Sequence, residues 1–458
     1  MFKKIKEFGI KKGGVLYSNA LEVLFEHLKL RLFPEGCDPF TESLLIVPSL
    51  GMQQWIQREL ADSLGIACGF KPVFLHQALE ILRKRSFCEQ RAPLIPTPFE
   101  LALAIESEIR MIQESPEALW APLITYIQGK EGRKWALVHH LAQLFEKYGL
   151  YAQGSAEHWE HQPEGWQQAL WARVFKKWDY PHRIMTALYP NNVQQDTHVH
   201  LFAFSHLSPL HFQFFSRLST HLPVHFYQLS PCQEFWSDLA GQDHPSLLGS
   251  MGKVGREMAR LIEESDSEVE EAYLVFGGQT QLRRLQRDLL RLQVTEERVD
   301  DLSIQVHSLT TPHQEVENLY HILVNLFTHE GIEPKEVIVM APQITHYTPY
   351  IQAIFEDKIP YQIADMPMEQ THPLLKGLML MLNLERRRWS SLALLELVDY
   401  PLFAKKQGLT EKERLEIRAW MQKTGIRWAV DKEHRAALLK KGGCQKELKE
   451  GAATWMEG

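Results

Sequence analysis

Two short motifs in the chain have the residue types of a metal site. Glu356-Asp357-Lys358 matches the E-x-K element that nucleases place beside a metal ion. His198 and His200 alternate along an apolar run, which would put both imidazoles on one face of a strand. Three charges at the end of a helical pattern are usually a solvated turn, and two histidines without the H-E-x-x-H spacing are weak support for zinc. We therefore interpret both motifs as structural and predict no metal site.

Two other sets of residues have the chemistry of nucleic-acid contacts. Arg284, Arg287 and Arg291 recur at helical spacing, so they would form a stripe that is either solvated or in contact with phosphates. Trp135 and Trp166 have flat faces suited to base stacking, although tryptophan at helical spacing usually packs in a core. We expect a solvated stripe and core tryptophans, with nucleic-acid contact as the alternative for each.

Both halves of the machinery that grips a nucleoside triphosphate are missing from the sequence. No G-x-x-x-x-G-K-[ST] occurs: the first apolar run continues into residues 17–21, and Lys11-Lys12-Gly13-Gly14 lies before that run. The Asp-Glu pair that would hold magnesium after a later strand is also missing, because Ser205-His206-Leu207-Ser208-Pro209 follows residues 201–204. The chain is therefore predicted not to hydrolyse ATP, and without a G-x-S-x-G it has no sign of a serine nucleophile.

The elements that must position these residues alternate between strands and helices. Apolar runs predict strands at residues 15–19, 44–48, 198–204 and 224–227, with helices opening at Gly51 and covering residues 210–218. A second series begins later, with predicted strands at 303–307, 337–340 and 361–363 and helices at 316–327 and 350–355. Alternation of this kind is typical of a parallel α/β sheet.

The pattern divides the chain into six segments. Residues 1–14 form a basic N-terminal extension. The first α/β domain comprises residues 15–76 and 195–240, and a tryptophan-rich helical insertion, residues 77–194, interrupts it. Residues 241–301 connect this domain to the start of a second α/β domain at 302–384, and residues 385–458 are a further helical segment.

Composition narrows the class of protein. The chain has 458 residues, 45% of them hydrophobic, and a formal charge of −7, so it has no strong positive field to attract nucleic acid, and DNA binding would need a local surface. None of its five cysteines forms a C-x-x-C pair, which fits a reducing compartment. The most apolar stretch, residues 374–384, is too short to span a bilayer, so we expect no membrane partner.

Six segments, in one order from Val15 almost to the last residues, resemble segments of a known family, the RecC gamma subunits of bacterial exodeoxyribonuclease V. Three of them are Leu16-Tyr17-Ser18-Asn19-Ala20-Leu21-Glu22-Val23-Leu24, similar to Y-H-S-N-x-L-x-x-L; Ser49-Leu50-Gly51-Met52-Gln53-Gln54-Trp55-Ile56-Gln57, similar to G-M-x-Q-W-L-Q after a strand; and Leu144-Phe145-Glu146-Lys147-Tyr148, similar to L-F-D-x-Y. The others are Trp166-Gln167-Gln168-Ala169-Leu170-Trp171, similar to W-Q-x-x-L-W; Gln314-Glu315-Val316-Glu317, similar to R-E-V-E; and Thr424-Gly425-Ile426-Arg427-Trp428, similar to S-G-I-R-W.

The resemblance implies UvrD-like helicase-type domains that have lost their ATPase motifs, which agrees with the missing phosphate-binding residues. It implies a non-catalytic, DNA-guiding subunit of the RecBCD helicase–nuclease, acting in recombinational double-strand break repair in the bacterial cytoplasm. RecB-like and RecD-like partners would carry the nuclease and both motors and would use ATP and Mg²⁺. This chain would hold no cofactor and would contact double-stranded DNA ends and single-stranded DNA.

The resemblance also implies which residues face the single strand. Glutamine can read a base edge with two hydrogen bonds, and leucine can lie against a base face. The candidates after the second strand are Ser49, Leu50 and Gln54, and those on the L-F-D-x-Y helix are Gln143, Leu144, Glu146 and Lys147.

The sequence departs from the family pattern in ways that keep other functions open. Pro48 and Leu50 replace polar residues of some relatives, which leaves fewer hydrogen bonds for reading a Chi sequence, and Gln314 replaces an arginine. The family also continues well beyond the length of this chain. One alternative is therefore a catalytic helicase–nuclease subunit of the AddB type, and another is a truncated gene product without function.

Overall fold

The computed structural model describes residues 14–33, 43–65, 70–86, 95–115, 117–129, 131–152, 154–187, 197–239, 247–265, 267–296, 298–364, 366, 368, 372–441 and 454–456. Residues 1–13 of the predicted basic extension lie outside the described residues, and so do all cysteines except Cys232. The chain divides into two compact units, Met1–Gln305 and Val306–Gly458.

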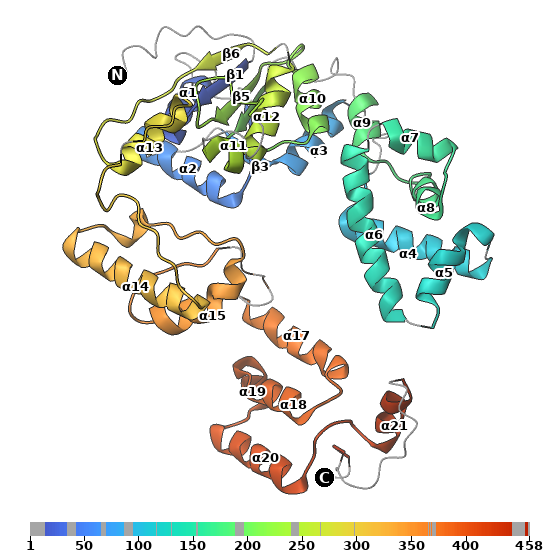
Figure 1. Cartoon of the computed structure of the whole chain (residues 1–458). Coiled ribbons are helices and arrows are strands. Elements are labelled where there is room, and N and C mark those ends of the chain that lie inside the picture. Colours follow the sequence, from blue (N-terminus) through green and yellow to red (C-terminus); the bar gives the residue numbers. More distant parts are fainter. Residues whose placement is uncertain are drawn as a thin grey trace. The chain divides into compact units, whose positions relative to one another are not determined.

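A parallel sheet of six strands is the centre of the first unit (Figure 1). In sheet order the strands are β3 (Lys71–Phe74), β2 (Ser43–Val47), β4 (His198–Phe202), β5 (Val224–Leu229), β1 (Gly14–Ser18) and β6 (Val269–Glu271). Every neighbouring pair runs parallel, with Ile46 opposite Leu201 and Val15 opposite Phe226. The predicted α/β class with a parallel sheet is confirmed for this unit.

The four strands predicted in this unit are confirmed, and two edge strands were missed. β1, β2, β4 and β5 are buried on both faces, so they read as continuous apolar runs. β3 contains Pro72, and β6 is the sequence Val-Glu-Glu, so neither has a strand-like pattern. β6 comes from residues 241–301, which we predicted to be a connection, and it pairs with β1 in the same sheet.

Helices cover both faces of the sheet. On one face, α1 (Leu21–Leu32) and α2 (Leu50–Leu64) pack against Leu16, Leu45 and Phe202. On the other, α3 (Leu75–Ser86), α10 (Pro209–Leu218) and α12 (Lys253–Glu263) pack against Val15, Ile46 and other residues of the strands. Two further helices of the first unit are α11 (Leu247–Met251) and α13 (Gln281–Leu290).

Between α3 and β4 the chain forms a helical insertion with its own core. Its elements are α4 (Pro98–Glu114), η3 (Ala118–Trp120), α5 (Ala121–Ile127), α6 (Glu131–Tyr151), α7 (Gly154–His161), α8 (Trp166–Val174) and α9 (Pro181–Ala187). α4 starts where it does because Thr97 and Glu100 form a capping box, which satisfies two free amides of the first turn, and Pro98 occupies a position that needs no donor.

All the regular elements that the structure describes in the second unit are helices. Its elements are α14 (Pro312–His329), η6 (Pro334–Glu336), α15 (Ile344–Phe355), α17 (Pro373–Arg386), α18 (Ser391–Val398), α19 (Pro401–Gln407), α20 (Glu411–Thr424) and α21 (Lys432–Lys441). The helices predicted at 316–327 and 350–355 are present as α14 and α15, which share one core. The strands predicted at 303–307, 337–340 and 361–363 are wrong: these residues form no strand.

Candidate nucleic-acid interface

The connection from β2 to α2 carries three of the candidate residues. Ser49 is the N-cap of α2, where its hydroxyl accepts a hydrogen bond from the Met52 amide at 3.2 Å. Leu50 begins the helix with 57% of its surface exposed, and Gln54 is exposed one turn later. The cap fixes the direction of the first turn, so Leu50 and Gln54 face solvent at the carboxyl edge of the sheet.

The other residues of this motif hold the turn in place. Trp55 stacks on Phe202 of β4, with ring centroids 6.3 Å apart, and meets the edge of Phe25 from α1 at 5.5 Å. Met52 packs against the same core, and Ile56 is fully buried in it. The apolar residues of the motif therefore anchor α2 on the sheet, which leaves Gln54 on the outer side of the helix.

The connection from β1 to α1 differs sharply from a phosphate-binding loop. It consists of Asn19 and Ala20, and the segment after β6 closes over it. Asn19 Nδ2 donates to the Leu274 carbonyl and its Oδ1 accepts from the Leu274 amide, both at 2.8 Å. The Ser18 hydroxyl donates to Ala272 O and accepts from the Ala20 amide. A phosphate loop is several residues long and rich in glycine, whereas this turn has only two residues, neither of them glycine.

Helix α6 carries the other four candidates, on a face that is mostly exposed. Gln143, Glu146 and Lys147 are exposed, and Leu144 is half-buried against the core of the insertion. Residues three and four apart lie on one side of a helix, so Gln143, Glu146 and Lys147 form one patch. Leu144 offers less surface to a base than the resemblance implied.

Aromatic residues on the opposite side of α6 hold this patch in position. Phe145 is fully buried and contacts the edge of Trp171 at 5.3 Å, while the Tyr148 hydroxyl accepts a hydrogen bond from Gln167. Gly149 allows α9 to approach closely, because a Cβ there would lie 3.1 Å from Pro181 Cδ. The two resembling motifs, L-F-E-K-Y and W-Q-Q-A-L-W, therefore meet in one core and turn their polar residues outward.

An ion pair joins α6 to α4 beside this patch. Lys134 Nζ lies 2.8 Å from Glu106, and both side chains are almost completely buried. The hydrogen bond from Lys134, helped by Arg110, lowers the pKa of Glu106 despite its burial, so the carboxylate stays charged. Removing Glu106 would leave the buried Lys134 charge without this partner, so the pair helps to hold α4 and α6 together.

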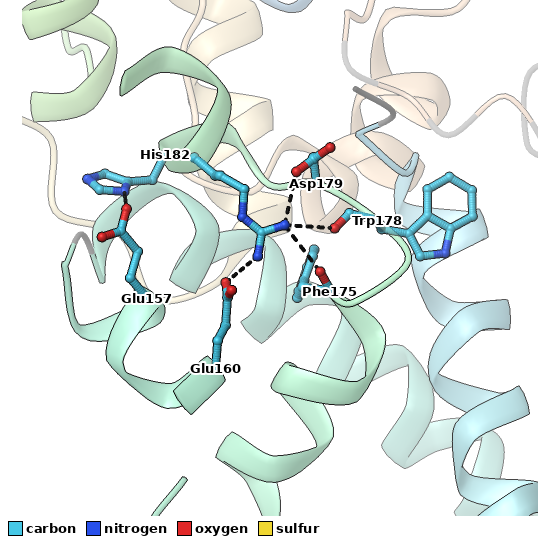
Figure 2. Close-up of polar contacts among 7 residues, drawn as sticks. Glu157, Glu160, Phe175, Trp178, Asp179 and His182 are labelled. Atoms are coloured by element: carbon cyan, nitrogen blue, oxygen red, sulfur yellow. Dashed lines mark hydrogen bonds and ion pairs between the residues drawn. The ribbon is translucent and has the colours of Figure 1, made fainter. Parts of the chain in front are cut away.

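Arg183 of α9 ties together the three short helices that support α6 (Figure 2). Its Nη1 donates to Asp179 Oδ1 at 2.9 Å and to the carbonyls of Phe175 and Trp178, and its Nη2 pairs with Glu160 of α7. The guanidinium also lies 4.7 Å from the centroid of the Tyr180 ring. The planar Arg183 guanidinium, with its five N–H donors, thus joins the ends of α7, α8 and α9.

The two motifs considered as metal sites lie in different surroundings. Glu356-Asp357-Lys358 forms the exposed end of α15, and Lys358 lies over the ring of Tyr320. His200 is fully buried in the sheet and stacks on His225 at 5.3 Å. Among the described residues, no group of three or more His, Cys, Asp or Glu side chains is arranged to hold a metal ion.

The arginine stripe and the two tryptophans, for which nucleic-acid contact is the alternative, differ in their exposure. Arg287 of the stripe is half-buried, and its Nη1 donates to the carbonyl of Gly278 at 2.6 Å. Trp166 packs on the core of the insertion as expected. The expectation of a core position is wrong for Trp135, which is 46% exposed on α6. Its indole lies eight residues before Gln143, on the same side of the helix.

The structure places the seven candidates in two groups, on α2 and on α6. It also draws attention to Ser205 and His206, which sequence reasoning noted only for their lack of a carboxylate. Both are exposed at the end of β4, the neighbour of β2 in the sheet. Sequence patterns could not identify these two residues as candidates, because nothing in the local sequence shows that β2 and β4 are adjacent in the sheet.

Two family models match the chain, one within the first unit and one within the second. A family model described as RecC, N-terminal domain, matches residues 14–292, which is more than half of the chain. The chain belongs to the RecC family. A second model, RecBCD enzyme subunit RecC fourth domain, matches residues 371–458. The predicted resemblance to an N-terminal part of RecC is therefore confirmed.

Individual RecC proteins align with most of the chain. RecBCD enzyme subunit RecC of Mycolicibacterium smegmatis (strain ATCC 700084 / mc(2)155) is 26% identical over 87% of this chain and 41% of its own length. The same subunit of Escherichia coli (strain K12) is 25% identical over 92% of this chain and 45% of its own length. That of Haemophilus influenzae (strain ATCC 51907 / DSM 11121 / KW20 / Rd) is 23% identical over 91% and 46%. The chain therefore spans less than half the length of these relatives.

Membrane insertion of a helix finds no support. None of the helices in the described part of the chain combines the length and the apolar character needed to cross a bilayer.

Proposed function

We propose that this RecC-family chain is a non-catalytic subunit that guides DNA in a RecBCD-type helicase–nuclease during double-strand break repair. The proposal rests on the membership of the RecC family, since the relatives aligned above are RecBCD enzyme subunits. The partners would be RecB-like and RecD-like chains in the bacterial cytoplasm. They would supply the nuclease and both ATP-driven, Mg²⁺-dependent motors.

The observation that carries the non-catalytic role is the closed turn after β1. In a UvrD-like motor the first strand of the sheet leads into the loop that cradles phosphates. Here Asn19 and Ser18 use that turn to bond the segment after β6. The end of β4 carries Ser205 and His206 in place of a carboxylate pair. A motor-type sheet with these replacements would support a DNA strand that other subunits move.

The two exposed groups are suited to different parts of a single strand. Gln54 and Gln143 can read base edges, and Glu146 can accept a hydrogen bond from a cytosine amino group. Lys147 suits a phosphate, whose contacts add affinity without sequence preference. Ser49 can donate its hydroxyl hydrogen while its oxygen caps α2, and Leu50 and the exposed part of Leu144 would lie against bases.

The direct test is reconstitution. Unwinding of blunt duplex ends by the RecB-like and RecD-like partners should require this chain in a form that spans the length of its relatives. Equal unwinding rates with and without it would refute the proposal. A filter-binding assay should retain no ATP on the isolated chain, whereas stoichiometric retention would favour the AddB-type alternative.

The candidate residues can be tested in the same assembly. Gln54→Ala and Gln143→Ala should each weaken binding of a single-stranded oligonucleotide about five- to tenfold, since each loses up to two hydrogen bonds to a base. Gln352→Ala, at an exposed glutamine of α15 in the second unit, is the control and should bind like the wild type. If all three variants bind alike, the assignment of Gln54 and Gln143 is wrong.

A further inference from the structure

β2 and β4 are parallel neighbours in the sheet, but the connections that follow them lead to opposite sides of the sheet. From β2 it passes through α2 to β3 at one side of the sheet, and from β4 it passes through α10 to β5 at the other. The two helices also lie on opposite faces, since α2 packs with Leu45 and Phe202 and α10 packs with Ile46 and Phe226 (Figure 1). In open α/β sheets, ligands bind where neighbouring strands diverge in this way, outside the carboxyl ends of the two strands. We refer to this place as the β2–β4 crevice.

Exposed residues meet at this point from both strands. Val47 and Phe202, near the ends of the strands, are fully buried, yet Pro48, Ser49 and Leu50 on one side are exposed. On the other side Ser205 and His206 are exposed. Ile46 pairs with Leu201, and neighbouring strands lie about 4.8 Å apart, so the two connections start side by side.

The backbone holds Ser205 and His206 outward. Ala203 has a φ of 53°, in the left-handed region that non-glycine residues avoid, and its amide is fixed by a 2.8 Å hydrogen bond to Tyr227 O. Phe204 and Leu207 are both buried in the core on either side. Ser208 caps α10 by accepting from the His211 amide. The anchoring and capping are thus done by the flanking residues, and the two exposed side chains serve neither purpose.

The charge around this crevice suits a polyanion. The chain carries 57 acidic residues and a net charge of −7, yet residues 43–58 and 197–233 contain no Asp or Glu. These two segments supply β2, β4, β5, α10 and the start of α2. A phosphate backbone would therefore meet no carboxylate from either connection.

We propose that Ser205 and His206 form part of the single-stranded DNA site, opposite Ser49 and Leu50 across the β2–β4 crevice. The inference rests on the proposed function and extends it to a second connection of the sheet. His206 stacks on a base or bonds its edge, and Ser205 donates to a phosphate. The same strand passes Leu50 on the other side.

The experiment measures binding of a fluorescent oligo(dT) by the assembled complex, with fluorescence anisotropy. His206→Ala should weaken binding about tenfold, the usual effect of losing one stacked or hydrogen-bonded base contact. His221→Ala is the matched control, because His221 is an equally exposed histidine before β5, at the amino edge of the sheet. Rescue by His206→Phe would assign stacking, and rescue by His206→Gln would assign hydrogen bonding; either supports the contact.

Three outcomes distinguish a failure of this inference from a failure of the proposed function. Equal affinities for the His206→Ala and His221→Ala variants overturn the inference while the proposed function stands. Normal DNA affinity with impaired assembly of the His206→Ala complex also overturns it, because the crevice would then be a protein contact. A wild-type complex that unwinds duplex ends equally well without this chain refutes the proposed function itself.

Discussion

Asn19 makes both hydrogen bonds of its side-chain amide with the backbone of a single residue, Leu274, which lies 255 positions later in the chain. The amide thereby imitates a neighbouring strand and extends the ladder between β1 and β6 by one step. It also closes the turn at which a motor domain would hold phosphates. A single asparagine thus links the fold of the first unit to its proposed lack of ATP chemistry.

Replacement of Asn19 should destabilise the first unit. Asn19→Ala leaves the amide and carbonyl of Leu274 without their partners, which should lower the free energy of unfolding by about 1–3 kcal/mol. Asn19→Asp keeps the acceptor and loses the donor, so it should fall between alanine and the wild type. Urea unfolding followed by tryptophan fluorescence measures the difference. Wild-type stability in Asn19→Ala would mean that the turn is held by Ser18 alone.

Arg183 should matter for the insertion far more than an ordinary surface arginine. Arg183→Met removes donors from two carboxylates and two carbonyls, and Arg183→Lys cannot restore the planar set of contacts. We expect a loss of about 2–3 kcal/mol, below the value for a fully buried pair because the side chain is one-third exposed. Thermal melting and proteolysis within residues 154–187 report the change.

Arg110 provides the control for this prediction. It also pairs with a glutamate on its own helix, but its side chain is mostly exposed. Arg110→Met should change stability by less than about 1 kcal/mol, as exposed pairs usually do. Similar losses for the Arg110 and Arg183 variants would show that the contacts of Arg183 are as weak as a surface pair.

The buried histidines of the sheet should make the protein sensitive to acid. Burial, together with nearby Arg31, lowers the pKa of His225 to about 3, and burial lowers that of His200 well below its usual value. The unfolded chain binds protons near pH 6.5 and the folded chain does not, so stability is full above that pH and declines as the pH falls towards 3. The slope should reach about 1.4 kcal/mol per pH unit for each histidine.

Urea unfolding at pH 7.5, 6.0 and 5.0 measures this slope. The double variant His200→Phe/His225→Val removes both titrating groups from the core and should flatten the profile, whereas His221→Ala, at an exposed position, should not. An unchanged slope in the double variant would assign the acid sensitivity to other groups, such as His211, whose pKa burial lowers to about 4.

Trp135 and Trp171 should give opposite results although both belong to the insertion. Trp171 is fully buried among Phe145, Phe175 and Tyr180, so Trp171→Ala should cost about 3–5 kcal/mol of stability. Trp135 is half-exposed beside the Gln143 patch, so Trp135→Ala should leave the melting temperature unchanged and weaken oligo(dT) binding about tenfold. Trp135→Phe should keep most of the binding. DNA affinity equal to the wild type in Trp135→Ala would exclude stacking at this position.

The strands illustrate which parts of the fold could be predicted. β2 and β4 are buried on both faces, and Ser-Leu-Leu-Ile-Val is unambiguous for that reason. Residues 337–340 have an equally strand-like sequence, but Ile338 is 80% exposed and Met340 84%, and they form no strand. A strand needs a neighbour to satisfy its hydrogen bonds, and local periodicity carries no information about whether that neighbour exists.

The sequence by itself determined the family, the parallel α/β class of the first unit, the helical insertion and the absence of a G-x-x-x-x-G-K-[ST] motif. These depend on short-range patterns: buried runs, helical spacing and motif residues that must keep their order. Tertiary structure alone decided that Asn19 meets Leu274, that Trp135 is exposed while Trp166 is partly buried against a core, and that the connections after β2 and β4 start side by side. Each of these depends on which strands and helices become neighbours, and long-range packing free energy sets that choice.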